Sequence, residues 1–543
     1  MGSTPPRKRP ANEGVRSGSS PTVAAPDSAC HAGGRGLESR RSRLSKYLQT
    51  CRFRFYPIRR GQRPVWTSRP ERCLRATTGV EHAAAVAVAP SENRESIDKV
   101  DEMQDGQGTE MMRKHHQMTL WAPFAVIALG GFVALAPLAF DYRDGWLAAS
   151  DIVSGLLLVA LGYRSLSPAG GLARWGATAV GIWLMFAPLL FWAPTAASYA
   201  IGTLVGALAI AFSILIPGMP GMRMLDGPTT PPGWSYNPSS WPQRLPPIAA
   251  ALAAFLVARY MAGYQLGHGG STWDPFFGDG SERVLTSDVS KMFPISDAGL
   301  GAFAYMLEAL SGFMGGTNRW RTMPWMVLMF FILVVPLGIV SIVLVILQPL
   351  AVGTFCTPCL VTAMLMLVMI PFAVDEVVAM AQFLANVRRR DDSVWTNFWR
   401  GGTLEGEGAR DEATLPAPLA KVACAARRGV NFAPSLLASA ALGIALMFLP
   451  PLFGVEAGAA EANWLFGPLI VTFAVTAMAD VVRPLRFVNV LLALAAGIAP
   501  FLIGERDVGY AVTTLVVAVV VLALSLPRAA VGERYERWNE RIA

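Results

Sequence analysis

The sequence predicts an all-α, polytopic membrane protein with about twelve transmembrane helices. Of its 543 residues, 53% are hydrophobic and only 15% are charged, whereas a soluble protein carries about 25% charged residues. Apolar runs of about 20 residues, the length that crosses a bilayer, recur along the chain between Gly, Pro or Arg residues. The basic residues lie in short loops and tails, so the net charge of +8 indicates membrane orientation and a lipid bilayer as partner, not nucleic acid.

Residues 1–112 form a separate basic segment that is rich in Arg, Pro, Gly and Ser. The segment has no lasting apolar period, so we expect it to be disordered. No uninterrupted apolar stretch follows its basic start, so it is not expected to be a secretory signal. Cys30, Cys51 and Cys73 lie here and are given no functional role.

The rest of the chain divides into three groups of four expected spans. The first group, residues 118–217, has spans at 118–140, 145–163, 172–193 and 196–217, and a Pro-rich linker follows it. The central group, residues 245–388, has spans at 245–266, 296–315, 323–347 and 353–372, the last continuing as a polar-faced helix. A cytoplasmic linker, 389–430, precedes the last group, 431–527, with spans at 432–453, 463–481, 487–504 and 509–526, and a cytoplasmic tail, 528–543.

The arginines alternate from loop to loop in a way that predicts the orientation. The expected outer loops contain as basic residues only Arg143, Arg283, Lys291 and Arg506. The expected inner loops contain many more, among them Arg164, Arg174, Arg223, Arg244, Arg319, Arg321, Arg388, Arg389, Arg390, Arg428, Arg483 and Arg486. By the positive-inside rule both termini are cytoplasmic, and residues 353–359 lie near the outer face.

The two outer groups share an internal repeat. A small residue precedes a proline by the same offset in Gly130…Pro137, Gly181…Pro188, Gly443…Pro450 and Ala493…Pro500, and the next span begins near Trp146, Tyr199, Trp464 or Tyr510. We interpret each unit as a helical hairpin, ended or kinked by the proline and anchored at the interface by the aromatic side chain. The pattern resembles the SPW repeat family of small bacterial membrane hairpins, which implies no known chemistry. Asp151 is the clearest buried ionisable residue here, and we favour packing over transport.

Cys356 and Cys359 form a C-x-x-C pair at the start of an expected span. Thiols at this spacing fall on one helical turn, where they can form a disulfide and exchange it. The pair alone is compatible with redox chemistry, half of a metal site or a structural bridge. No second C-x-x-C or Cys/His cluster accompanies it outside the first segment, so no metal site is predicted.

Residues 245–388 contain three motifs in a fixed order: Val284 to Ser290, Phe293 to Tyr305, and Phe355-Cys-Thr-Pro-Cys359. In the order and spacing of these motifs, this part of the chain resembles the vitamin K epoxide reductase family. The resemblance implies a central four-helix bundle, flanked here by the SPW-like groups. It also implies oxidoreductase activity between thiols and a membrane quinone of the ubiquinone or menaquinone type, placing the chain in a bacterial inner membrane.

The resemblance also implies roles for individual residues. Cys359 corresponds to the cysteine that faces the quinone, and Cys356 to the one that exchanges with another thiol pair. Ser287 corresponds to a loop hydroxyl near the quinone, although it could equally be a helix-cap serine. Asp297 lies where some members place a polar side chain against a quinone carbonyl, and it could equally be a capping carboxylate.

Two positions depart from the family pattern. The paired loop cysteines are absent, with Ser281 at the place of the second, and Ala363 replaces a tyrosine that some members carry. Without loop cysteines the thiol partner must be a separate external protein, with Cys356 accessible to it and Cys359 deeper, against the pocket. Arg259 and Glu308 are further intramembrane candidates, as a mutual ion pair or a proton relay.

Two functions are therefore in competition. The leading hypothesis is a membrane quinone–thiol oxidoreductase, supported by Ser287 and both cysteines in the family register. The alternative is a non-catalytic membrane scaffold, or a transporter, that retains an inert C-x-x-C, and the missing loop cysteines favour it. The sequence leaves open the direction of electron flow, the quinone and the thiol partner.

Overall fold

The computed structural model describes residues 114, 117–142, 145–220, 227–403, 418–455, 458–527 and 531–542. The predicted disordered segment, residues 1–112, lies outside this part of the chain. The described residues are mostly helical and contain no strand beyond isolated bridges. Eleven of their helices are long and apolar enough to cross a membrane. The predicted all-α polytopic fold is confirmed.

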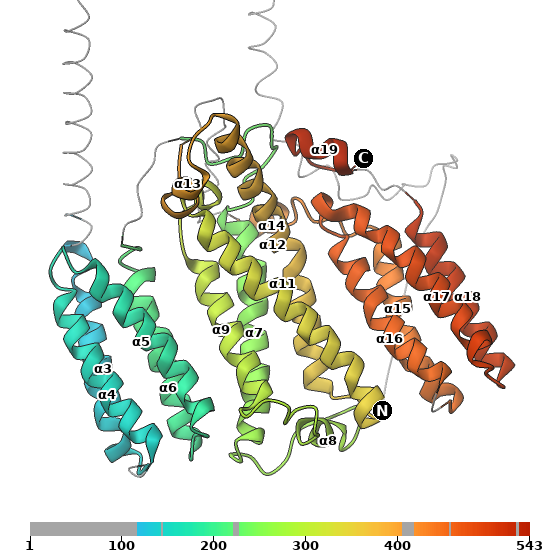
Figure 1. The fold of residues 1–543 in the computed structure, drawn as a ribbon, viewed down its shortest axis with the longest axis horizontal. Helices are drawn as coiled ribbons and strands as arrows, with labels where there is room; N and C mark the ends of the chain where they lie inside the picture. The colour runs from blue at the N-terminus through green and yellow to red at the C-terminus, as the bar shows by residue number, and fades with distance from the viewer. Residues whose placement is uncertain are drawn as a thin grey trace, which may run out of the picture. The chain divides into compact units, whose positions relative to one another are not determined.

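The first and last groups are each built from two helical hairpins (Figure 1). The first group contains α3 (Trp121–Ala139), α4 (Trp146–Arg164), α5 (Gly171–Leu190) and α6 (Ala196–Ile210), which continues as η2 (Ala211–Leu215). The last group contains α15 (Pro434–Phe453), α16 (Ala459–Thr476), α17 (Val488–Ile503) and α18 (Val508–Ser525), with η4 (Asp480–Phe487) before α17. Pairing within each hairpin follows directly from the short connections.

Glycines let the two backbones of a hairpin approach closely. A Cβ atom added to Gly130 in α3 would lie 2.6 Å from the carbonyl oxygen of Gly155 in α4, and the reverse distance is 2.5 Å. Gly443 and Gly467 face each other in the same way between α15 and α16, at 2.9 and 2.8 Å. Because any side chain would push the helices apart, the glycines of the repeat are packing residues.

The prolines and aromatic residues of the repeat lie only partly at the membrane interface. The prolines lie buried inside the last turns of their helices, as Pro137 does in α3. Trp146 is exposed, as a lipid-facing anchor should be, but Tyr199 and Tyr510 are buried. The prediction of interfacial anchors is wrong for these two tyrosines, because each packs against a neighbouring helix; the Tyr510 hydroxyl, for example, donates to the carbonyl of Ala459.

The central group lies between the outer groups along the chain (Figure 1). Its long helices are α7 (Trp241–Gln265), α9 (Asp297–Phe313), α11 (Pro324–Leu347), continued by η3 (Gln348–Val352), and α12 (Thr357–Arg389). Short helices connect or follow them: α8 (Gly280–Leu285), α10 (Arg319–Thr322), α13 (Val394–Arg400), α14 (Leu419–Ala426), η5 (Glu536–Trp538) and α19 (Asn539–Ile542). With only 17 residues, α9 is the expected span that is not among the eleven.

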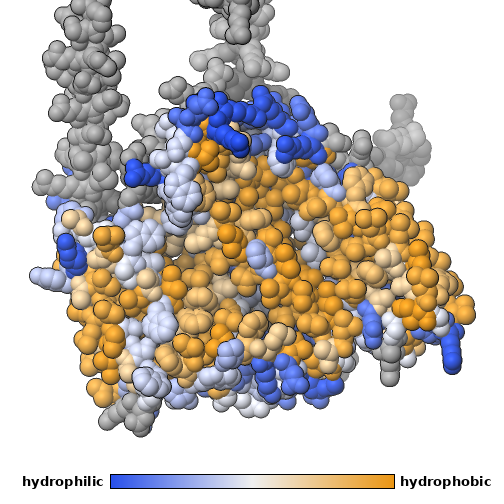
Figure 2. Space-filling view, viewed as in Figure 1, coloured by the Kyte–Doolittle hydropathy of each residue, from blue (hydrophilic) through white to orange (hydrophobic). Residues whose placement is uncertain are grey.

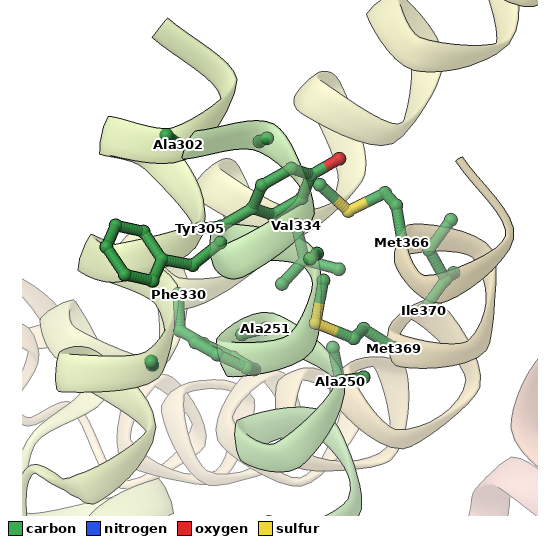
Figure 3. Packing of buried hydrophobic residues seen from close by; sticks show 14 of the residues in the cluster. Ala250, Ala251, Ala302, Tyr305, Phe330, Val334, Met366, Met369 and Ile370 are labelled. Atoms are coloured by element: carbon green, nitrogen blue, oxygen red, sulfur yellow. The ribbon is translucent and has the colours of Figure 1, made fainter. Parts of the chain in front are cut away.

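The core of the central group is apolar and mixes small with large side chains. Figure 3 shows the Tyr305 ring directed from α9 toward Met366 and Ile370 of α12, with Val334 of α11 between them. Small residues such as Ala251 let α7 approach α9 and α12. Close packing of this kind fixes the rotation of each helix, and with it the side chains that face the interior of the group.

One end of the central group holds a buried polar cluster. The guanidinium of Arg319 makes two hydrogen bonds of 2.6 Å with the carboxylate of Glu376. Arg244 donates to the carbonyls of Gly312, Met314 and Gly315. Both arginines are buried. They were predicted as loop charges that set orientation, but they are bound inside the protein, where they satisfy the carbonyls at the end of α9.

The surface is consistent with a membrane protein. In Figure 2, hydrophobic residues cover most of the long helices, while hydrophilic residues gather at the two ends, near α13 and α14 and near α8. The buried Asp151 of α4 accepts a hydrogen bond of 2.9 Å from Tyr142.

Candidate active site

The C-x-x-C pair forms the first turn of α12. Gly353, at φ 75°, ends η3 and reverses the chain, so that Cys356 caps α12 and Cys359 lies one turn further on. Pro358 is tolerated in this first turn because its missing N–H would have no helical partner. A disulfide joins Cys356 to Cys359, and their Cα atoms are 5.3 Å apart. The structure therefore represents the oxidised form of the pair.

A cavity lies between the four long helices of the central group, beside the disulfide. It contains about 730 Å³ of space not filled by protein atoms. Cys359 lines it, and Met261 of α7 lies close by, with 3.5 Å between the two sulfur atoms. The walls are mainly aliphatic, with a few polar groups, among them Ser287, Asp297, Tyr305, Ser341, Gln348 and Thr362. This composition is typical of a pocket for a small, largely apolar molecule.

Both predicted quinone contacts line this cavity, but their polar atoms are engaged. The Ser287 hydroxyl donates to the carbonyl of Val284 at 2.7 Å and receives the N–H of Ser290 at 3.3 Å. The Asp297 carboxylate accepts from Gln265 at 2.6 Å. Ser296, not Asp297, caps α9 by accepting the N–H of Gly299.

Tyr305 brings a phenol to the cavity from α9. Its hydroxyl lies 3.5 Å from the carbonyl oxygen of Thr362, at the edge of hydrogen-bond distance. Ala363 also lines the cavity. Some members of the family that this part of the sequence resembles have a tyrosine at that position. An aromatic hydroxyl is thus available here from a different helix.

The loop before α8 covers the C-x-x-C turn. Asp274 accepts hydrogen bonds from the Thr357 hydroxyl at 2.5 Å and from the Ser281 hydroxyl at 2.6 Å. Gly280 lies so close that an added Cβ would be 2.3 Å from the carbonyl oxygen of Phe355. As a result Cys356 is completely buried, with 0% exposure. The prediction of an accessible Cys356 is wrong for this state, because the loop, fastened by Asp274, lies over it.

Asp274 is held as a carboxylate. Burial would raise its pKa, but hydrogen bonds from Ser281 and Thr357, and from the backbone N–H groups of Phe277 and Phe276, outweigh burial and lower the pKa to about 2. The loop is therefore fastened by a charged acceptor at neutral pH.

Arg259 and Glu308 do not form the expected ion pair. The guanidinium of Arg259 lies 5.7 Å from the ring of Tyr199, in α6. Glu308 is fully buried in α9, and neither carboxylate oxygen has a hydrogen-bond partner. Neither residue lines the cavity beside Cys359. The helices place the two side chains toward different neighbours, a rotation that sequence spacing does not fix.

Sequence reasoning missed four contributors to the site, and one of them is Tyr305 of α9. Asp274 precedes a proline, a turn signal that indicates a loop but not its target. Gln265 and Gln348 are polar residues at the ends of apolar helices; Gln265 binds Asp297, and Gln348 accepts the N–H of Cys356 at 3.0 Å. In the sequence, a polar residue at the end of an apolar helix was the signal that could have identified Gln265 and Gln348.

Comparison with known families agrees with this geometry. Residues 245–374, which include the whole cavity and the C-x-x-C pair, match the vitamin K epoxide reductase family. No curated protein and no solved structure matches the chain. Within a multi-pass membrane protein, residues 245–374 are therefore similar to the vitamin K epoxide reductase family, and this match supports a function of the membrane thiol–disulfide oxidoreductase type.

Proposed function

We propose that this protein is a quinone–thiol oxidoreductase in which Cys356 and Cys359 exchange electrons with a membrane quinone bound in the cavity. The observation that carries the proposal is that Cys359 lines a largely apolar cavity between helices, with its disulfide partner immediately behind it. A quinone is an apolar two-electron carrier, and such pockets between bundle helices suit it. The family match supports the thiol–disulfide half of the reaction.

The reaction balances as a two-electron exchange. In one direction the two thiols lose two electrons and two protons to the quinone, which becomes the quinol as the Cys356–Cys359 bond forms. An external dithiol then attacks Cys356, Cys359 leaves as thiolate, and the partner's second thiol releases Cys356. The partner is left as a disulfide, and every step can run in reverse. The start of α12 favours the Cys356 thiolate, because the N–H of Cys359 points at the Cys356 sulfur atom, 3.3 Å away.

Only side chains that can donate a hydrogen bond can bind the carbonyl groups of the quinone. A quinone carbonyl accepts hydrogen bonds, and an ionised Asp297 cannot donate one. The Tyr305 hydroxyl is a donor at the cavity, and Ser287 becomes one if it turns away from Val284. The amide nitrogen of Gln265 already donates to Asp297 and to the carbonyl of Leu285. We assign Asp297 to holding Gln265 in place, and Tyr305 and Ser287 to the quinone itself.

Exchange with a protein partner requires the loop to move. No cysteine occurs between Cys73 and Cys356, so no internal relay is encoded there. Because Cys356 is buried, an external thiol reaches it only when the contacts of Asp274 with Thr357 open. We place this exchange at the outer face of a bacterial inner membrane, with both termini in the cytoplasm, following the distribution of arginines in the loops.

A non-catalytic scaffold, or a transporter, with a structural C-x-x-C is the second candidate. Complete burial of Cys356 favours it, because an inert bridge needs no access. Titration of the reduced protein with ubiquinone and menaquinone analogues, with Cys356 and Cys359 thiols counted by mass spectrometry, separates the two. The oxidoreductase loses two thiols per quinol formed, and Tyr305→Phe weakens quinone binding while leaving the disulfide intact. A pair that stays reduced with every quinone supports the scaffold.

A further inference from the structure

A second cleft, distinct from the cavity beside Cys359, lies between α6 and α7. It contains about 810 Å³ of unfilled space and is more open than that cavity. The residues that matter for its chemistry are Tyr199, Arg259, Tyr260, Tyr264 and His268. None of the described residues that line it is acidic. The cleft is therefore positively charged and aromatic, and it lies where the first group of helices meets the central group.

Arg259 is the charged centre of this cleft. It is six positions before the end of α7 at Gln265, which places it about 9 Å along the helix axis from that end. Its contact with the Tyr199 ring is a cation–π interaction, and its buried Nε atom has no hydrogen-bond partner. No ion pair to Arg259 occurs among the described residues. An arginine in a membrane-spanning helix is costly unless an anion neutralises it.

His268 brings a second unsatisfied nitrogen to the same cleft. Its Nε2 lies 2.8 Å from the carbonyl oxygen of Ala193, so that nitrogen carries the proton and donates. Its Nδ1 is buried without a partner. In the neutral ring Nδ1 is a hydrogen-bond acceptor. The ligand that satisfies both side chains carries an anionic group for Arg259 and a hydroxyl for His268.

We infer that this cleft binds an anionic glycerophospholipid whose headgroup carries a hydroxyl, with the phosphate paired to Arg259 and the hydroxyl donating to His268. Arginine is well suited to phosphate because its planar donors match the oxygens. Tyr260 and Tyr264 present the amphipathic rings that suit the headgroup level, and Leu256, which is exposed on α7, continues the cleft toward the acyl chains. The lipid then fills the junction between α6 and α7, and the inference does not depend on redox activity.

The test measures lipid retention by native mass spectrometry of the full-length protein. Protein delipidated in detergent receives phosphatidylglycerol, phosphatidic acid, phosphatidylcholine or inorganic phosphate. Wild type should retain phosphatidylglycerol best, and Arg259→Gln should weaken this retention by about tenfold, the loss expected for one charged partner. Arg506→Gln is the matched control, because Arg506 is an exposed arginine in the α17–α18 loop, away from the cleft.

His268→Phe tests the hydroxyl contact independently. It should remove the preference for phosphatidylglycerol over phosphatidic acid while leaving the Arg259 phosphate contact. If Arg259→Gln does not fold, Arg259→Lys replaces it, and retention should then fall between those of wild type and a protein without the site. Equal retention by wild type and the Arg259 variant overturns the inference. Displacement of the lipid by inorganic phosphate shows a phosphate site filled from solution, and it overturns the lipid assignment.

Discussion

In the outer groups the helices meet through glycine backbones, whereas in the central group they meet around buried polar side chains and a cavity. Gly130 and Gly155, or Gly443 and Gly467, leave no room between their helices. The central helices instead enclose the Arg319–Glu376 pair at one end and the cavity at the other. Closely packed apolar hairpins are suited to supporting the central group, and an internal cavity with polar atoms is suited to binding and converting a substrate.

The last group also reaches the active-site turn directly. The ring of Phe448 in α15 lies 5.1 Å from that of Phe355, the residue before Cys356, and 6.0 Å from that of Phe277 in the covering loop. Phe277 and Phe355 also touch each other. The outer helices are thus not uniform: α15 contacts the C-x-x-C turn through Phe448, whereas no ring of the described residues of the α3–α4 hairpin contacts that turn.

The largest expected effect comes from Cys359. Cys359→Ser should abolish quinone reduction, because no thiol then faces the cavity, while the hairpins and their stability stay unchanged. Cys356 can still attack the disulfide form of the external partner and release one partner thiolate, and without Cys359 to resolve it the mixed disulfide should accumulate. Non-reducing electrophoresis of membranes detects it, with Cys356→Ser as the control that cannot form it. Full activity of Cys359→Ser would refute the proposed mechanism.

The next largest effect is expected from a mutation in the polar cluster of the central group. Arg319→Met leaves the buried Glu376 carboxylate without its cation, which costs about 3–5 kcal/mol when one partner of a buried pair is removed. The thermal midpoint in detergent should fall far below that of Arg506→Met, an exposed control. A midpoint equal to wild type would mean that water reaches Glu376 and that the cluster does not stabilise the fold.

Smaller effects should separate the two kinds of hairpin. Gly130→Ala and Gly443→Ala each place a Cβ against a facing backbone, and overpacking of this kind costs about 1–3 kcal/mol. Only Gly443→Ala should also slow thiol–quinone exchange, because displacement of α15 moves Phe448 away from Phe355. Thermal unfolding and quinone turnover, measured on both variants, make the comparison. Equal quinone turnover in the two variants would show that the last group does not support the C-x-x-C turn.

The smallest effect concerns the covering loop. Thr357→Val removes one hydrogen bond to Asp274, worth about 1 kcal/mol, so the population with an open loop should rise about fivefold. The rate at which a water-soluble phosphine reduces the Cys356–Cys359 disulfide measures that population. A rate unchanged from wild type would show that loop opening does not limit access to the sulfur atoms.

The same assay has a defined pH dependence. Because the pKa of Asp274 is lowered from 3.8 to about 2, its contribution to loop closure is complete above pH 3.8 and is lost as the pH falls toward 2. Reduction of the wild-type disulfide should therefore accelerate across this interval. In Thr357→Val the acceleration should be smaller, since part of the stabilisation of the carboxylate is already gone.

The sequence by itself determined the helices, the C-x-x-C turn and the similarity of the central group to the vitamin K epoxide reductase family. These are properties of hydrophobic runs of bilayer length and of residues near one another in the chain. The glycines and prolines of the repeat were also visible, but not the fact that Gly130 meets Gly155. Of the residues expected at the site, Cys359, Ser287 and Asp297 line one cavity.

Only the tertiary structure decided what each buried side chain touches. Asp274 reaches Thr357 across 83 positions of sequence, and this contact buries the cysteine that was expected to be accessible. The rotation of α7 and α9 directs Arg259 toward Tyr199 and leaves Glu308 unpaired. Hydrophobic patterning identifies a helix and its span, but rotation and register between helices are set by the packing of many side chains together.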